Sequence, residues 1–355
     1  MRKLSYLIVG SGHRSLFYGR IAARYPSFFR ALFLTRSEEK AAFVQKSTGV
    51  PATCSLDEAL AFSPDFVVVA VDRGHMAEVV LSWAERGFPV AAETPLGKTR
   101  EELDLLWRAH TEKGAKIISV EQYPRHPLIT AGLSLTRRGL IGEPQSAYLS
   151  LVHDYHAAAM LRALLNVTGE SYVMRGERTT APALETDSRT GAILDGQVTD
   201  RVRDVIHITY SSGKWALYDF SSLQYRTFIH GRHLVLRGER GEWNDTQVCF
   251  TDSDHLPCRL QLMAELPARY RHLDTQTLRD LRKYWQPELF LSNDHDEFAI
   301  ASMLYDMGDY LSGDQPPYPL ADALDDAAFW LDVEQAVTTP WQPVQSQPAP
   351  WRQGD

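Results

Sequence analysis

Short apolar runs alternate with amphipathic segments through the first 120 residues of the chain. The apolar runs predict buried strands at residues 4–9, 31–34, 66–71, 89–92 and 116–120. The segments between them predict helices at residues 16–25, 38–47, 75–86 and 99–113, and a shorter one capped by Ser55. Strands and helices that alternate in this way are typical of a parallel, doubly wound sheet.

The pattern changes after a predicted helix at residues 127–138, and longer strands with turn residues between them follow. A strand is predicted at 145–152, a hairpin at 205–210 and 215–222, and a second pair at 227–230 and 232–237 around Gly231. Residues 176–204 are polar and without period, which predicts a long loop or a mobile flap. Helices are predicted at 296–311 and 320–338, and an extended tail after Pro340. The second half is thus predicted as a mostly antiparallel sheet with helices on one face.

A glycine turn joins the first strand to the first helix. Gly10 permits a tight turn, and Gly12 lets the backbone approach a pyrophosphate, which the N–H groups at the helix start would bind. Ser15 stands where a third glycine is usual. This context predicts a Rossmann domain that binds a dinucleotide, with His13 and Arg14 as further contacts. The alternative is a turn that only reverses the chain.

The end of the second predicted strand indicates which dinucleotide binds. An NAD site usually has a carboxylate there for the ribose hydroxyls, but this chain has Thr35, Arg36 and Ser37. An arginine flanked by hydroxyls can bind a 2′-phosphate, so we expect NADP, with NAD as the alternative. Arg36 as a solvated surface charge is the competing interpretation. Asp72 follows a strand at the edge where ligands bind and is a further candidate contact.

Composition and charge restrict the number of domains, the kinds of partner and the location of the protein. A chain of 355 residues favours two domains, and its formal net charge of -8 argues against nucleic-acid and membrane partners. The three cysteines, Cys54, Cys249 and Cys258, form no metal-binding spacing and suit a reducing compartment. The apolar start is too short for a signal peptide, and no run approaches the roughly 20 residues of a membrane helix. We therefore expect a cytoplasmic protein without a bound metal.

The chain resembles the Gfo/Idh/MocA family (glucose-fructose oxidoreductase and inositol dehydrogenase) over nearly its whole length. The resemblance lies in the order of the glycine turn and the segments 91–96, 121–127, 138–143, 156–165, 298–300 and 320–336. It implies a Rossmann domain at 1–122, an α/β domain with a large open sheet at 123–340, and a tail at 341–355. It also implies sugar, polyol or sugar-derivative substrates, and a homodimer or homotetramer built through the exposed face of that sheet.

Two polar residues of the family pattern are replaced in this chain. Thr94 stands at the family's catalytic lysine, between the retained Glu93 and Pro95, and threonine supplies neither a cation nor a useful acid or base. Ala159 stands at the family's aspartate, while His156 matches its histidine. The resemblance also places Gln122 near the nicotinamide amide and carries Glu93 over as a cofactor contact.

The cluster at residues 153–156 offers acid–base groups in place of those missing at Thr94 and Ala159. We expect His156 to be the main acid or base, oriented by Asp154, with Thr94 and Tyr155 bonding the substrate hydroxyl. If the strand from residue 145 continues here, alternate residues share a face. A metal site and a plain surface cluster are the alternatives. A weaker polar group in the second sheet, which includes Tyr225, is a further candidate for substrate contact.

Three functions therefore remain open. The first is an NAD(P)-dependent oxidoreductase acting on a carbohydrate or polyol hydroxyl. The second is a non-catalytic, dinucleotide-binding sensor or regulatory subunit, for which loss of the lysine and aspartate would be typical. The third is a redox-neutral sugar lyase or epimerase that regenerates its cofactor in every cycle.

Overall fold

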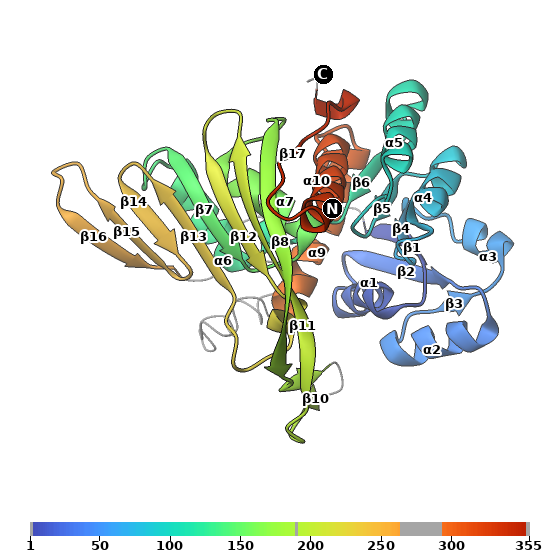
Figure 1. The fold of residues 1–355 in the computed structure, drawn as a ribbon. Coiled ribbons are helices and arrows are strands. Elements are labelled where there is room, and N and C mark those ends of the chain that lie inside the picture. The colour runs from blue at the N-terminus through green and yellow to red at the C-terminus, as the bar shows by residue number, and fades with distance from the viewer. Residues whose placement is uncertain (1–2, 189–190, 263–292, 353–355) are drawn as a thin grey trace. The chain divides into compact units, whose positions relative to one another are not determined.

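The computed structural model describes residues 3–188, 191–262 and 293–352, which fall into two compact units (Figure 1). The first unit holds residues 3–126 and 293–327 of those described, and the second holds 127–188, 191–262 and 328–352. The domain boundaries proposed from the sequence stay a prediction.

The first unit is built on a six-stranded parallel sheet in the order β3-β2-β1-β4-β5-β6. Its strands are β1 (Leu4–Val9), β2 (Phe29–Leu34), β3 (Ala52–Thr53), β4 (Phe66–Val69), β5 (Val90–Ala92) and β6 (Ile117–Ser119). Its helices are α1 (His13–Arg24), α2 (Glu38–Thr48), α3 (Leu56–Ala61), α4 (Met76–Glu85), α5 (Arg100–Lys113) and α9 (Asn293–Leu311). The order reverses between β1 and β4, so the predicted doubly wound Rossmann sheet is confirmed.

Local chemistry explains where these helices begin and end. The side chains of Ser37, Ser55 and Thr99 each accept a hydrogen bond from the helix that they precede. Gly49 and Gly114 end α2 and α5 in the left-handed conformation that glycine adopts without strain.

The second unit contains a nine-stranded, mostly antiparallel sheet in the order β16-β15-β14-β13-β7-β12-β11-β8-β17. Its strands are β7 (Pro144–Ser150), β8 (Tyr172–Leu184), β11 (Val198–Tyr210), β12 (Trp215–Phe220), β13 (His233–Gly238), β14 (Gly241–Asn244), β15 (Gln247–Thr251), β16 (Pro257–Gln261) and β17 (Val344–Gln345). The helices α6 (Pro127–Arg137), α7 (Asp154–Leu165) and the second half of α10 (Leu320–Thr338) belong to it. Alternate side chains such as Ile206 and Ile208 are fully buried, while their neighbours are half-buried. The predicted open, mostly antiparallel sheet is confirmed.

The prediction of a loop or flap at residues 176–204 is wrong. Most of this segment lies in β8 and β11, which pair from Tyr172 opposite Tyr210 to Leu184 opposite Val198. The outer half of the pair carries exposed or half-buried side chains on both faces, and Arg178 bonds across the pair to the buried Asp204 where this half begins. A strand of this kind needs no apolar alternation, and so the sequence pattern did not reveal it.

Two smaller predictions are also wrong. Residues 227–230 form no strand, and β13 pairs instead with β7 and with β14. The strand that begins near residue 145 ends at Ser150, and His153 is the N-cap of α7. The side chains at 153–156 therefore follow helical geometry rather than the two faces of a strand.

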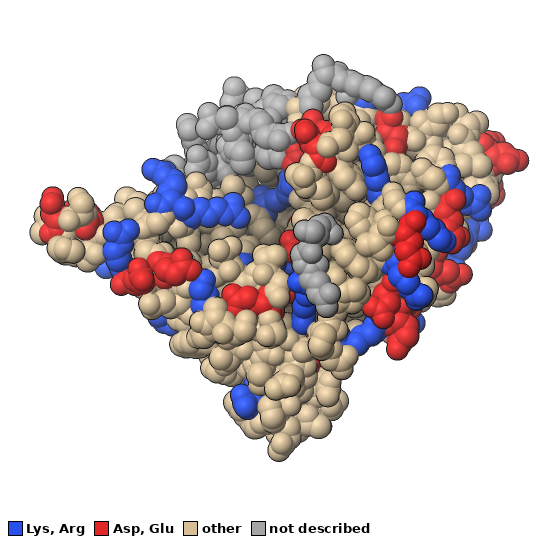
Figure 2. Space-filling model, turned by 90° about the horizontal axis from the view of Figure 1, so that it is seen from above, with Lys and Arg blue, Asp and Glu red and all other residues tan. Residues whose placement is uncertain are grey.

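The described surface carries both signs of charge. On the face that Figure 2 shows, basic and acidic side chains are interspersed rather than gathered by sign. Within the described ranges, no helix is long and apolar enough to span a membrane.

Candidate functional site

The turn after β1 has the backbone that a dinucleotide site needs. Gly10 has φ +138°, and a Cβ atom there would lie 2.2 Å from the Ala70 carbonyl oxygen, so only glycine fits. A Cβ atom on Gly12 would meet nothing within 4 Å. Gly12 is the N-cap of α1, with no side-chain cap and no acidic residue in the first turn. The N–H groups at the start of α1 are thus available to an anion.

The close packing of α1 on the sheet is made at Gly19, which lies outside the glycine turn at residues 10–15. Ser15 is fully buried and its hydroxyl donates to the Gly12 carbonyl oxygen at 2.6 Å. One turn later, a Cβ atom on Gly19 would lie 2.8 Å from the Phe33 ring. Gly19 therefore provides the close packing of helix on strand that the third glycine of the motif usually gives.

Two predicted cofactor contacts, Arg14 and Glu93, belong to a partly buried ion network. Arg14 bonds Glu93 at 3.0 Å and Asp296 at 2.6 Å, and the Tyr18 hydroxyl donates to Glu93 at 2.7 Å. Burial alone would raise the pKa of Asp296, but Arg14 and the His126 ring hold this pKa well below its ordinary value. The network fixes the loop after β5 against α1 and α9, so Arg14 and Glu93 already have protein partners.

Thr35, Arg36 and Ser37 differ in what they offer a ligand. The buried Thr35 hydroxyl donates to the Ser37 carbonyl oxygen at 3.1 Å, and the Ser37 hydroxyl accepts the Lys40 N–H at 3.3 Å. Arg36 is exposed and has no ion-pair partner within the described part of the chain. The guanidinium of Arg36 and the hydroxyl proton of Ser37 are thus the groups open to a phosphate.

Four further candidates lie near the carboxyl ends of the strands or at the start of α1. Asp72 is exposed and accepts the Gly74 N–H at 2.8 Å, while His13 is exposed with its ring 5.3 Å from that of Phe17. Thr94 is half-buried and joined to Pro95 by a cis peptide bond. Gln122 is 2% exposed, and its Oε1 atom has no hydrogen-bond partner among the described residues. A buried amide oxygen without a donor is costly, which marks Gln122 as a group that a ligand N–H would satisfy.

In the second unit, the imidazole of His153 lies between two tyrosine hydroxyls. Its Nδ1 atom is 2.5 Å from the hydroxyl of Tyr225, and its Nε2 atom is 2.9 Å from that of Tyr155. The His156 ring lies edge-on to His153 at 4.9 Å and to Tyr155 at 4.6 Å. The structure thus joins three residues of the predicted cluster with Tyr225, which comes from 72 residues further along the chain.

Asp154 is held differently from its neighbours. It has φ +39°, its N–H donates to the Tyr218 hydroxyl at 3.0 Å, and that hydroxyl donates to Asp154 Oδ1 at 3.4 Å. Burial, with smaller effects from Asp204 and Glu334, raises the pKa of Asp154 from 3.8 to about 6. A carboxyl group with such a pKa can exchange a proton close to neutral pH. Tyr218 could not be identified from the sequence, because nothing there distinguishes it from the tyrosines of other strands.

No metal site accompanies these residues within the described ranges, where no group of three or more His, Cys, Asp or Glu side chains is placed to hold an ion. The metal interpretation of residues 153–156 gains no support from this.

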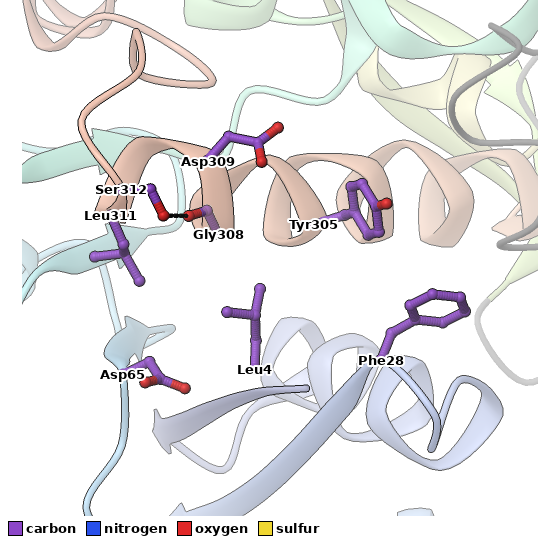
Figure 3. A pocket seen from close by; sticks show the side chains of 8 residues that line it. All are labelled: Leu4, Phe28, Asp65, Tyr305, Gly308, Asp309, Leu311 and Ser312. Atoms are coloured by element: carbon purple, nitrogen blue, oxygen red, sulfur yellow. Dashed lines mark hydrogen bonds between the residues drawn. The ribbon is translucent and has the colours of Figure 1, made fainter. Parts of the chain in front are cut away.

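A pocket of about 360 Å³ lies elsewhere in the first unit (Figure 3). Leu4 at the start of β1 lines it, whereas the glycine turn follows the other end of this strand. It contains none of the predicted site residues. Its lining consists of Leu4, Phe28, Asp65, Tyr305, Gly308, Asp309, Leu311 and Ser312.

The fold and the glycine turn define a domain of the dinucleotide-binding class. Residues 4–122 match the model of the Gfo/Idh/MocA oxidoreductase family, NAD-binding Rossmann fold. The resemblance predicted from the sequence is confirmed over these residues. No curated protein matches the sequence.

Solved structures share the fold of the whole chain at low sequence identity. An oxidoreductase from Agrobacterium radiobacter in complex with NAD+, L-tartaric acid and magnesium is 14% identical, with a TM-score of 0.69 over 97% of this chain and 98% of the other. A levoglucosan dehydrogenase in complex with NADH and levoglucosan is 15% identical, with a TM-score of 0.69 over 98% and 100%. A UDP-N-acetylglucosamine 3-dehydrogenase from Acidithiobacillus ferrooxidans is 14% identical, with a TM-score of 0.63 over 96% and 100%.

Proposed function

We propose that this protein is an NAD(P)-dependent oxidoreductase that moves hydride between the nicotinamide and a carbon bearing a hydroxyl of a sugar, polyol or sugar derivative. The observation that carries this proposal is the glycine turn at Gly10 and Gly12, with its uncapped helix start, in a domain of an oxidoreductase family. The substrate class is supported by two structural neighbours named as dehydrogenases of sugars.

The residues of the first unit fit the cofactor. The start of α1 offers N–H groups to the pyrophosphate, Gly12 leaves room for it, and the orphaned Oε1 atom of Gln122 can accept from the nicotinamide amide. When bound, the nicotinamide supplies the carbon that accepts or donates the hydride. Thr94 brings no positive charge to this chemistry, although its hydroxyl can hydrogen-bond a substrate oxygen. We assign proton transfer to the cluster that holds His156, Tyr155 and Asp154.

The test is to measure binding and turnover separately. Purified protein is titrated with NADH and NADPH by fluorescence, and then followed by nicotinamide absorbance across a panel of sugars, polyols and sugar acids. Binding in the micromolar range together with turnover of at least one panel member is the expected result. Failure to bind either dinucleotide would refute the proposal.

NADP is the proposed cofactor, with NAD as the alternative, because Arg36 is exposed at the end of β2 and no carboxylate precedes it there. In Arg36→Ala the dissociation constant of NADPH should rise about tenfold, which corresponds to the loss of one charge-assisted contact. The dissociation constant of NADH should stay within twofold. Lys46→Ala, which removes an exposed charge from the last turn of α2, is the matched control. Equal effects of Arg36→Ala on both dinucleotides would exclude this role.

A non-catalytic sensor is the second candidate, favoured by Thr94 and Ala159 at the positions of the family's lysine and aspartate. It predicts tight cofactor binding without turnover of any panel member. The third candidate, a redox-neutral lyase or epimerase, predicts product without net change in nicotinamide absorbance. Chromatography of the sugars after incubation separates these two outcomes.

We also propose that the protein is a homo-oligomer located in the cytoplasm. The half-buried, mixed face of the nine-stranded sheet supports a homodimer or homotetramer, which light scattering would measure. The three cysteines are free thiols, which supports a cytoplasmic location.

A further inference from the structure

The loop between β5 and α5 carries a lysine to which the site described above gives no role. Lys98 is exposed, and its ammonium group has no hydrogen-bond or ion-pair partner among the described residues. The backbone at this position is fixed, because the Lys98 N–H donates to the Glu102 carboxylate at 2.7 Å and the Thr99 side chain caps α5. Lys98 therefore presents an ammonium group to a ligand from a well-held loop.

The ammonium group of Lys98 lies beside the loop that follows β4. A Cβ atom on Gly74 would lie 3.5 Å from Lys98 Nζ and 2.9 Å from Asp72 Oδ1, so both charged groups lie where a side chain at Gly74 would project. The Asp72 side chain is 79% exposed, and its Oδ1 atom accepts the Gly74 N–H at 2.8 Å. A carboxylate and an ammonium thus lie close together at Gly74 without forming an ion pair with each other.

The place of Asp72 and Lys98 along the sheet indicates which part of a dinucleotide they meet. The loop after β4 begins against the glycine turn, since a Cβ atom on Gly10 would lie 2.2 Å from the Ala70 carbonyl oxygen. In the sheet, β2 lies on one side of β1, and β4 and β5 lie on the other. A dinucleotide spans the carboxyl edge of such a sheet, with its adenosine half at β2 and its pyrophosphate at the start of α1. The nicotinamide half is then the part that meets the loops after β4 and β5.

The chemistry of Asp72 and Lys98 together fits a diol better than a phosphate. A ribose offers two neighbouring hydroxyl groups, each of which can both donate and accept a hydrogen bond. The Asp72 carboxylate can accept from such a diol, and the Lys98 ammonium can donate to it, so both bonds are charge-assisted. A phosphate of the dinucleotide has only acceptor oxygens and a negative charge, which Asp72 would repel. The two side chains therefore favour the ribose of the nicotinamide half over the pyrophosphate.

We propose that Asp72 and Lys98 together bind the hydroxyl groups of the ribose that carries the nicotinamide. This inference rests on the proposed function, because it requires that the protein bind NAD(P). It gives Asp72 a defined partner on the cofactor, and it adds Lys98, which no motif in the sequence indicated. Since this ribose is bonded directly to the nicotinamide ring, the two contacts position the ring as well as adding affinity for the dinucleotide.

The test compares ADP with ADP-ribose, which share the adenosine and the pyrophosphate and differ in the terminal ribose. Both dissociation constants are measured by displacement of fluorescent NADPH. In wild-type protein we expect ADP-ribose to bind about tenfold more tightly than ADP. This ratio should fall to about twofold or less in Lys98→Met and in Asp72→Asn. Lys46→Met removes an exposed charge from α2 and is the control, which should keep the wild-type ratio.

The two substitutions change the net charge in opposite directions, which separates a direct contact from a general electrostatic effect. A long-range effect on an anionic ligand would weaken binding of both nucleotides in Lys98→Met and strengthen it in Asp72→Asn. The proposed contact instead lowers the ratio in both variants. The dissociation constants of NADH and NADPH should also rise alike, by about tenfold, in both variants, because both dinucleotides carry this ribose. Arg36→Ala, in contrast, should affect NADPH alone.

Each other outcome has a defined meaning. Equal losses of affinity for ADP and ADP-ribose in Lys98→Met would place the ammonium group at the pyrophosphate and overturn the proposal. A wild-type ratio near one, or unchanged binding of NADH and NADPH in either variant, would overturn it as well. Wild-type protein that binds neither dinucleotide would refute the proposed function instead. Protein that binds them but turns over no substrate leaves the test intact, because every measurement here is one of binding.

Discussion

Asp154→Asn should stabilise the second unit in a pH-dependent way. Burial raises the pKa of Asp154 to about 6 from its ordinary 3.8, so ionising it in the folded protein is unfavourable. A shift of about two units corresponds to about 3 kcal/mol. Because the folded pKa is the higher one, this cost is absent below pH 4, grows between pH 4 and 6, and is complete above pH 6.

Asparagine suits the site in other respects. Its side-chain oxygen can still accept from the Tyr218 hydroxyl, and it tolerates the positive φ of +39° at this position. The gain above pH 6 should therefore approach the full 3 kcal/mol, which raises the midpoint of thermal unfolding by about 5–10 °C for a unit of this size.

The assay is thermal unfolding at pH 5, 6, 7 and 8, with Asp195→Asn as the control. Asp195 is an exposed aspartate of the same unit, and its substitution changes net charge by the same amount. The difference between Asp154→Asn and wild type should be about half of its full size at pH 5 and reach its full size at pH 7 and 8, while the control changes little throughout. A gain independent of pH, or a loss of stability at pH 8, would refute the assignment of the raised pKa to burial of the carboxyl.

Two further predictions concern glycines. Gly10→Ala should lower stability and abolish dinucleotide binding, because its Cβ atom would lie 2.2 Å from a carbonyl oxygen. Gly12→Ala should unfold at the same temperature as wild type but bind the dinucleotide at least tenfold more weakly. Equal melting points for the two variants would contradict this reasoning. Gly132→Ala places a Cβ atom 2.2 Å from the fully buried Trp243 ring and should cost about 3 kcal/mol of unfolding free energy in denaturant melts, with Ser134→Ala in the same helix as the control.

The sequence predicted elements well where one physical signal dominated. The apolar run of β4 and the capping side chain of α3 were visible because burial on both faces and capping each leave a local mark. The pairing of β8 with β11 left no such mark, because the side chains of its outer half are exposed or half-buried on both faces and show no apolar alternation.

The same limit applies to the candidate site. The glycine turn is a contiguous motif, and so the sequence revealed it. The partners of His153 and Asp154 are Tyr225 and Tyr218, which come from a 3₁₀ turn and a strand more than sixty residues away. The sequence named the cluster but could not distinguish the half-buried His153 from the buried His156, because only the fold sets their depth.

The bond between Arg14 and Asp296 has a consequence for how the protein is made. Arg14 follows the glycine turn, while Asp296 and the rest of α9 lie 282 residues later. A ribosome therefore releases the last piece of the cofactor-binding unit only after residues 127–262, the larger part of the second unit, have been synthesised. Until then Arg14 is paired with Glu93 but not with Asp296. A fragment that ends at residue 126 would lack Asp296 altogether.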